Sequence, residues 1–349
     1  MRVAVIGGGL AGLTFAKHAS EFADVILIEP NDFMVCQALL PELLSGKVNI
    51  EDLCVSIGEF CDDFGVEHVR DKATGIGNGI VFTEKKEIEC EFAVIAVGAE
   101  TNYYGIEGAE RTYNVNTLEE TLKAKKALDN AEDIVVVGSG LTGVEVALEL
   151  AELGYGVKVV EAMDRILPTF SPKVSNFVYK IMMKEGIEVN TSTAVVRVEE
   201  DGVVTNKGKI SCDLVMWCAG LKPSEFVRNL DVPKERGWVK VDETLKANGF
   251  FAFGDCAHVE VDGKVATKTA LEARSQAKHS AENLKRMLRG DSPKPYRIRS
   301  SVDRPIAMIM LARGRAIMIY GGFVITKPMG LIYRMKKWAI ERFLGYFRP

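Results

Sequence analysis

The chain has 349 residues, which is enough for two domains, and its 47% hydrophobic and 26% charged residues are ordinary for a folded protein. These values exclude a peptide hormone and a disordered tail. The net charge of −4 argues against a nucleic-acid-binding protein. The charge is unevenly distributed, however. Residues 286–349 contain fourteen Lys or Arg against three acids, a net +11, so residues 1–285 carry −15.

Cysteine content and apolar stretches indicate where the protein resides. The seven cysteines include no CxxC pair, which predicts a reducing compartment and no metal site. The N-terminus lacks the charged, apolar and small-residue regions of an export signal. The longest apolar stretch, residues 306–325, is interrupted by Arg313 and Arg315 and predicts two buried strands rather than a membrane span. We therefore expect no transmembrane segment and a cytoplasmic location.

One internal repeat is the most informative feature of the sequence. A strand at residues 2–6 leads into the GxGxxG loop of Gly7, Gly9 and Gly12. A helix at 13–19 and a strand at 25–28 follow, and the strand ends at Glu29. The second copy has a strand at 134–137, the loop glycines Gly138, Gly140 and Gly143, a helix at 144–153, a strand at 157–160 and Glu161.

Each copy has the features of a dinucleotide-binding unit. The first glycine allows a tight turn, the second lets the backbone approach a pyrophosphate, and the third lets the helix pack on the strand. The pyrophosphate lies at the positive end of the helix, and the acid about 20 residues later binds the ribose hydroxyls. A single glycine loop could be a tight turn only. Two complete copies predict two dinucleotide sites, one for a tightly held flavin and one for an exchangeable nicotinamide.

Three further segments complete these sites. Strands at 92–99 and 213–220 run into small-residue turns that contain Ala99 and Gly220, and each closes one dinucleotide domain. The segment FFAFGDCA places Asp255 after a buried strand, at the expected start of the following helix. There its carboxylate could bind a ribityl hydroxyl. Neighbouring N–H groups, which include that of Ala257, could bind the pyrophosphate. A simple N-cap is the alternative reading of Asp255.

These motifs and their order resemble the two-dinucleotide-binding flavoproteins related to glutathione reductase, over roughly residues 1–288. The resemblance implies an α/β fold with two Rossmann-like domains and a short C-terminal membrane-associating segment. The implied domains are an FAD domain at 1–112 and 242–300, an inserted NADH domain at 113–241, and C-terminal strands with a basic amphipathic helix at 301–349. FAD would bind at Gly7, Gly9, Gly12, Glu29, Ala99, Asp255 and Ala257, and NADH at Gly138, Gly140, Gly143, Glu161 and Gly220.

Within this family, the chain is most similar to the type II NADH dehydrogenases. The similarity lies in QALLPELLSG at 37–46, AVGAETNYY at 96–104, GLTGVE at 140–145 and the segment 311–330. It implies that electrons pass from NADH through FAD to a quinone, without proton pumping. The paired glutamines of that group correspond here to Leu271 and Ser275, which leaves only Gln276 beside them.

Hydride transfer requires little acid–base chemistry from the protein, because the flavin relays the electrons. Glu145 is the candidate catalytic residue and is expected to point toward the nicotinamide carboxamide or flavin N5. A capping acid in the first turn of the helix is the alternative. The candidate acceptor site on the other flavin face comprises Cys36, Lys268, Thr269 and Gln276.

Other functions remain open at this stage. Phe33 to Cys36 matches the FxxC of soluble NADH oxidases and coenzyme A disulfide-type reductases, in which the cysteine reacts, although Cys36 could also be an ordinary buried side chain. Residues 268–284 are similar to sulfide:quinone oxidoreductases, but no cysteine follows Cys256. A redox-sensing flavoprotein is the non-enzymatic alternative.

Residues 331–349 predict an amphipathic helix that binds an anionic membrane surface. The projected apolar stripe contains Leu331, Met335, Trp338, Ala339, Arg342 and Tyr346, widened by Ile332 and Phe343, while Arg334, Lys337 and Glu341 fall opposite. A helix that only covers the core is the alternative. We expect a peripheral protein at the cytoplasmic face of the membrane, a quinone as its small-molecule partner and no nucleic acid, and the sequence leaves a homodimer open.

Overall fold

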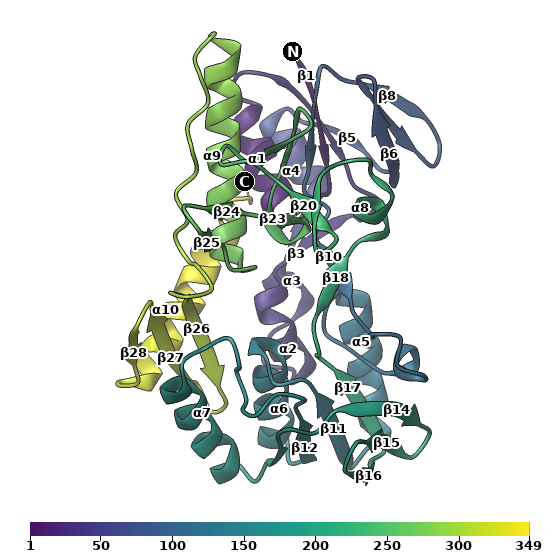
Figure 1. The fold of residues 1–349 in the computed structure, drawn as a ribbon, viewed down its shortest axis with the longest axis vertical. Helices are drawn as coiled ribbons and strands as arrows, with labels where there is room; N and C mark the ends of the chain where they lie inside the picture. The colour runs from purple at the N-terminus through teal and green to yellow at the C-terminus, as the bar shows by residue number, and fades with distance from the viewer. Residues whose placement is uncertain (349) are drawn as a thin grey trace.

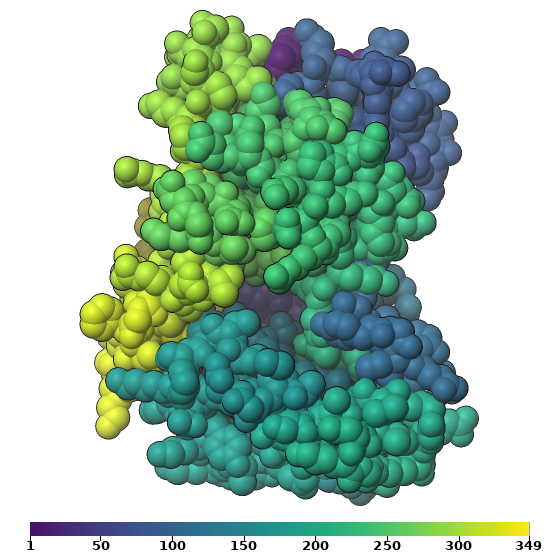
Figure 2. Space-filling view, in the orientation of Figure 1, coloured from purple at the N-terminus to yellow at the C-terminus, as the bar shows by residue number. Residues whose placement is uncertain are grey.

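The computed structural model describes residues 1–348, which form two lobes (Figure 1). The lobes are joined by an antiparallel pair, β10 (Ala99–Thr101) and β18 (Leu221–Pro223). Figure 2 shows a hollow where the lobes meet, with the yellow C-terminal segment along one side. This arrangement places the turn after residue 95 and the turn before residue 221 close to each other.

The first lobe is built on a six-stranded sheet whose central strand is β1 (Arg2–Ile6). β1 pairs in parallel with β2 (Asp24–Ile28) and β9 (Phe92–Ile95), and the sheet continues with β5 (Glu67–Val69) on one side and β22 (Phe250–Ala252) and β21 (Lys246–Ala247) on the other. The central strands are apolar because both faces of a parallel sheet are covered. Helix α1 (Leu10–Ala19) packs on α9 (Ala270–Leu288) and begins three residues earlier than the sequence predicts, directly after Gly9.

The second lobe repeats this arrangement with a four-stranded parallel sheet. Its order is β13 (Glu188–Asn190), β12 (Gly156–Val160), β11 (Asp133–Val137) and β17 (Leu214–Trp217). Helices α5 (Leu118–Ala127), α6 (Leu141–Glu152) and α7 (Pro172–Lys184) belong to this lobe. The predicted α/β fold with two Rossmann-like units is confirmed.

Each lobe also has a three-stranded antiparallel sheet. Residues 73–89 form β6 (Ala73–Gly77), β7 (Ile80–Thr83) and β8 (Glu87–Glu89), and residues 195–211 form β14 (Val195–Glu199), β15 (Gly202–Thr205) and β16 (Gly208–Ser211). The segment after β2 contains β3 (Phe33–Val35), η1 (Gln37–Leu39), α2 (Leu40–Leu44), α3 (Ile50–Leu53), β4 (Cys54–Ser56) and α4 (Ile57–Phe64).

The C-terminal segment forms an antiparallel sheet and a helix. β26 (Ile306–Leu311) and β27 (Arg315–Tyr320) are the two strands predicted from the sequence, and β28 (Phe323–Ile325) adds a third. Helix α10 (Met329–Leu344) packs on β27, and β26 packs on α6. None of the helices in residues 1–348 is long and apolar enough to cross a membrane.

Helix α10 has one buried and one exposed face, so part of its predicted apolar stripe is wrong. Ile332 was expected to widen the exposed stripe, but it is buried because that face packs against the strands. Phe347, just after the helix, is fully buried against Phe60. Leu331, Met335 and Trp338 remain exposed, as predicted. The helix therefore covers the core and also presents an apolar surface.

Candidate functional site

The first glycine loop meets the steric requirements that its spacing predicts. Gly7 has φ +105°, and a Cβ there would lie 2.5 Å from the Ala96 carbonyl oxygen. A Cβ at Gly12 would lie 1.8 Å from the Gly7 carbonyl oxygen. At Gly9, in contrast, a Cβ would meet no atom of the described residues 1–348 within 4 Å. Gly7 and Gly12 are thus required by the chain itself, whereas the space at Gly9 is open to a ligand.

The second loop reproduces this pattern. Gly138 has φ +90° and its Cβ would lie 2.7 Å from the Cα of Ala219, and a Cβ at Gly143 would lie 2.0 Å from the Gly138 carbonyl oxygen. Within the described chain, Gly140 again faces open space. Gly9 and Gly140 are also the N-caps of α1 and α6, and neither helix start has a side-chain cap among residues 1–348. The free N–H groups fit a pyrophosphate at both positions.

The two acids at the strand ends are tied to their own loops. Glu29 accepts hydrogen bonds from the Gly8 N–H (2.7 Å) and from the Asn31 N–H (3.0 Å). Glu161 accepts from the N–H (2.8 Å) and the hydroxyl (2.6 Å) of Ser139. These contacts hold each carboxylate beside the turn where a ribose would follow the pyrophosphate. The sequence reading missed Ser139, although it lies between two of the loop glycines.

Asp255 lies in a single 3-10 turn, η4 (Gly254–Cys256), and not at the start of a helix, because α9 begins only at Ala270. Asp255 follows the strand β22 as predicted, but the predicted helix start and the N-cap alternative are wrong. Desolvation raises the pKa of the Asp255 carboxyl, and the Lys268 cation opposes this shift. A partly buried carboxyl next to the start of α1 is suited to hydrogen bonds from ligand hydroxyl groups.

Lys268 holds the Asp255 turn in place. Its ammonium donates to the carbonyl oxygens of Asp255 (2.6 Å) and Ala257 (3.0 Å) and lies 3.7 Å above the Trp238 ring. Desolvation lowers the pKa of Lys268, while Asp255 raises it. Lys268 as a whole is exposed, but its ammonium is bound by two carbonyl oxygens and the Trp238 ring.

Gln276 also holds this turn, and Thr269 caps the helix on which Gln276 lies. Thr269 caps α9 by accepting from the Glu272 N–H at 3.4 Å. Gln276 is buried, and its carbonyl oxygen accepts from the Gly254 N–H at 2.8 Å. Contact of either residue with an electron acceptor stays a prediction.

Cys36 is poorly suited to thiol chemistry. It is buried, and desolvation raises its pKa to about 11. The reactive form of a cysteine is the thiolate, which is scarce near neutral pH when the pKa is raised. The described residues form no disulfide, and Cys36 is one of seven free cysteines.

Glu145 forms a long-range ion pair that the sequence reading missed. It is the fifth residue of α6, and no acid occupies the first turn, so the capping alternative is wrong. Its carboxylate accepts from the Lys336 ammonium and from the Met310 N–H, both at 2.8 Å. Both side chains of the ion pair are buried. That the Glu145 carboxylate points toward the nicotinamide or flavin N5 stays a prediction.

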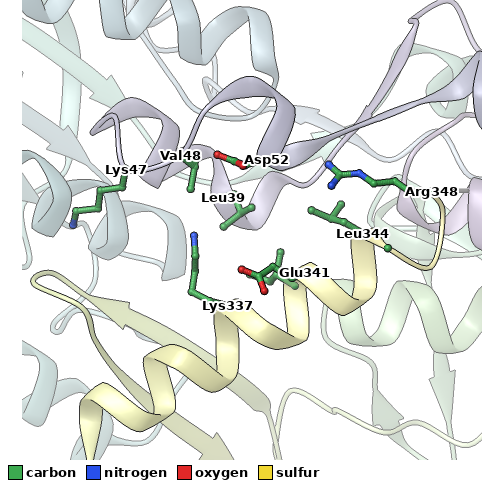
Figure 3. A pocket seen from close by; sticks show the side chains of 10 residues that line it. Leu39, Lys47, Val48, Asp52, Lys337, Glu341, Leu344 and Arg348 are labelled. Atoms are coloured by element: carbon green, nitrogen blue, oxygen red, sulfur yellow. The ribbon is translucent and has the colours of Figure 1, made fainter.

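A cavity of about 270 Å³ lies between α10 and residues 39–52 (Figure 3). It adjoins η1, which begins directly after Cys36. Leu39, Val48, Ile340 and Leu344 supply its apolar wall, and charged side chains surround it: Lys47, Asp52, Lys337, Glu341 and Arg348. An apolar ligand with polar oxygens would match this lining.

The profile of the pyridine nucleotide-disulphide oxidoreductase family matches residues 1–277. The chain belongs to this family. Membership confirms the predicted oxidoreductase class and the paired cofactors, FAD and NADH. The matched region ends within α9, so the C-terminal strands and α10 lie beyond it.

Relatives of known name cover almost the whole protein. The type II NADH:quinone oxidoreductase of Staphylococcus aureus is 28% identical in an alignment 378 residues long, and the alignment covers 96% of this chain and 93% of that protein. The structure of NDH2 from Plasmodium falciparum in complex with NADH has a TM-score of 0.86 at 18% identity and covers 99% and 97% of the two chains. The sulfide:quinone oxidoreductase of Aquifex aeolicus has a TM-score of 0.85 at 22% identity, with 99% and 91% covered. The two structural likenesses show a shared fold.

Proposed function

We propose that this protein oxidises NADH and passes the electrons through FAD to a quinone at a membrane surface. Near-full-length similarity to proteins named type II NADH:quinone oxidoreductase is the observation that carries the proposal. The two open glycine loops support it, because each fits one dinucleotide. Bound flavin would accept a hydride from NADH and release electrons to the second substrate.

The residues of each loop would bind and orient one cofactor. The Gly7–Gly12 turn would hold the FAD pyrophosphate, and the Asp255 turn, braced by Lys268, would face the ribityl chain. Glu161 would accept from the adenosine ribose of NADH and repel the 2′-phosphate of NADPH. Ser139 already positions that carboxylate.

Helix α10 supports a path for the acceptor. Lys337 lines the cavity next to η1, and its neighbour Lys336 binds Glu145 on α6. One helix thus borders the cavity and is joined to the nicotinamide-binding unit. We infer that a quinone enters through this cavity, close to the candidate residue Cys36.

Exposed apolar side chains of the C-terminal segment support attachment to a membrane. They lie on β27, β28 and α10, and Phe323 is the most exposed of them at 72%. These side chains are Tyr320, Phe323, Ile325, Leu331, Met335 and Trp338. Arg334 and Arg342 are exposed on the same helix, and aromatic side chains next to cations favour the interface of an anionic bilayer.

The attachment can be tested by substitution rather than by removing α10, because the other face of the helix is core. We expect Met335→Ser to weaken sedimentation with anionic liposomes, while Met183→Ser on α7 leaves it unchanged. Both methionines are 48% exposed, so the pair differs in location and not in exposure. Equal binding of the two variants would contradict the proposed surface.

The reaction is tested by steady-state NADH oxidation with flavin-loaded protein. A water-soluble quinone, coenzyme A disulfide and oxygen are compared as acceptors. We expect the quinone to give the highest kcat/KM, and Cys36→Ser to retain that activity. Disulfide reduction that depends on Cys36 would instead favour a thiol reductase, and NADH binding without turnover would favour a redox sensor.

A further inference from the structure

A second pocket, of about 520 Å³, lies on the first lobe between α9 and the segment at residues 294–299. Its charged lining groups are the side chains of Lys278, Arg297 and Arg299. Ser275, His279 and Tyr296 add polar groups, and no carboxylate belongs to the described lining. The three cations stand out because the chain as a whole carries −4.

The buried side chain of Glu272 fixes the pocket wall at residues 299–300. Glu272 is fully buried, and its carboxylate accepts from the backbone N–H groups of Arg299 (2.7 Å) and Ser300 (2.6 Å). It also accepts from the Tyr296 hydroxyl at 2.7 Å. Glu272 therefore holds the backbone of the segment and leaves the Arg299 guanidinium unneutralised.

A second clamp fixes the other end of the segment. Buried Asn283 accepts from the Lys294 N–H at 2.8 Å and donates to the Lys294 carbonyl oxygen at 2.9 Å. The backbone positions of Arg297 and Arg299 are thus set without a ligand. Such preorganisation lowers the entropy cost of binding.

The surrounding charges reinforce the positive potential. Arg274, Lys17 and the lining residue Lys278 all approach the Tyr346 ring, at 4.9, 3.8 and 5.3 Å. Desolvation lowers the pKa of Lys278, and the cations of Arg274, Arg299 and Lys17 lower it further. Over residues 1–348, no carboxylate oxygen lies within 4.0 Å of these five cations. The acids that act on the cluster from outside the lining are Glu272, which accepts from Tyr296, Glu21, which faces Lys17, and Glu282, which faces His279.

We propose that this pocket binds a phosphate group through Lys278, Arg297 and Arg299. Two guanidinium groups and one ammonium group supply many N–H donors to the oxygens of one tetrahedral anion, and arginine binds such oxygens in pairs. The phosphate can belong to an anionic phospholipid headgroup, since Tyr346 continues from α10, or to a soluble phosphate ester. The chemistry recognised by the pocket is the same for both.

The test uses the full-length, flavin-loaded protein with excess NAD⁺, so that the second glycine loop is filled. One arm titrates inorganic phosphate by calorimetry. The other arm measures sedimentation with vesicles of phosphatidylcholine, with or without phosphatidylglycerol. The variants are Lys278→Gln and Arg299→Gln, and Arg289→Gln at the end of α9 is the matched control because it removes the same charge outside the pocket.

We expect each pocket variant to weaken phosphate binding about tenfold, with Arg289→Gln close to wild type. If the pocket variants bind more weakly than Arg289→Gln in both arms, or in the phosphate arm alone, the site is supported and a soluble phosphate is one of its ligands. A difference only with phosphatidylglycerol vesicles assigns the headgroup. If both pocket variants behave like Arg289→Gln in both arms, the proposal is overturned.

Flavin absorbance and the melting temperature verify that each variant is folded. We expect Arg299→Gln to fold, because Glu272 binds the backbone of Arg299 and not its side chain. NADH:quinone turnover is measured separately, so loss of this site and failure of the proposed reaction are distinguishable.

Discussion

Replacing Lys336 with methionine should destabilise the protein strongly, because it leaves the Glu145 carboxylate without its cation. The N···O distance is 2.8 Å, and the two side chains are only 9% and 10% exposed. Removing one partner of a buried ion pair costs about 3–5 kcal/mol. The Met310 N–H still donates to Glu145 in the variant, so we expect the lower end, about 3 kcal/mol.

The chain contains a matched control for burial. Lys123 and Glu119 are also a lysine–glutamate pair, with an N···O distance of 2.7 Å, but their side chains are 66% and 79% exposed. We expect Lys123→Met to leave stability almost unchanged, because water already solvates both charges. The comparison separates the effect of burial from that of the contact itself.

The assay is urea unfolding of the flavin-loaded protein, followed by tryptophan fluorescence and flavin release. Combining Glu145→Gln with Lys336→Met should recover about 2 kcal/mol relative to Lys336→Met alone, since the buried charge is gone. The reasoning fails if Lys336→Met is no more destabilising than Lys123→Met, or if the double variant recovers nothing.

The remaining predictions concern the cofactor loops and the thiol. Gly9→Val should fold but lose flavin absorbance, because its side chain enters the space left for the pyrophosphate, and normal flavin content in the folded variant would contradict that assignment. Gly12→Ala should fail to fold, because its methyl group would lie 1.8 Å from a carbonyl oxygen. Glu161→Ala should lower the NADH-to-NADPH ratio of kcat/KM about tenfold, or about 1.4 kcal/mol, and an unchanged ratio would contradict the role of this carboxylate. Cys36 should react with thiol reagents very slowly at neutral pH and faster only as the pH approaches its pKa of about 11, because the thiolate forms as the pH rises; rapid labelling near neutral pH would refute its burial.

The glycine loops could be predicted from the sequence because their requirements are local. Gly7 and Gly138 need a positive φ, and Gly12 and Gly143 need close contact with the turn only five residues earlier. The repeat of strand, loop, helix and acid therefore predicted both sheets and both dinucleotide sites. Helix starts were less well predicted, since α1 and α6 begin directly after Gly9 and Gly140, which are already caps.

Only the tertiary structure decided which distant side chains meet. Glu145 and Lys336 are 191 residues apart, and their contact depends on the C-terminal sheet docking against α6. The same is true of the clamp that Glu272 forms on the backbone of Arg299 and Ser300, from which the phosphate pocket is inferred. No sequence periodicity predicts such pairs, because in the local sequence each of these side chains is simply a charged residue on a helix. Folding brings them into surroundings that exclude water, and there a single charged contact contributes far more than it would on the surface.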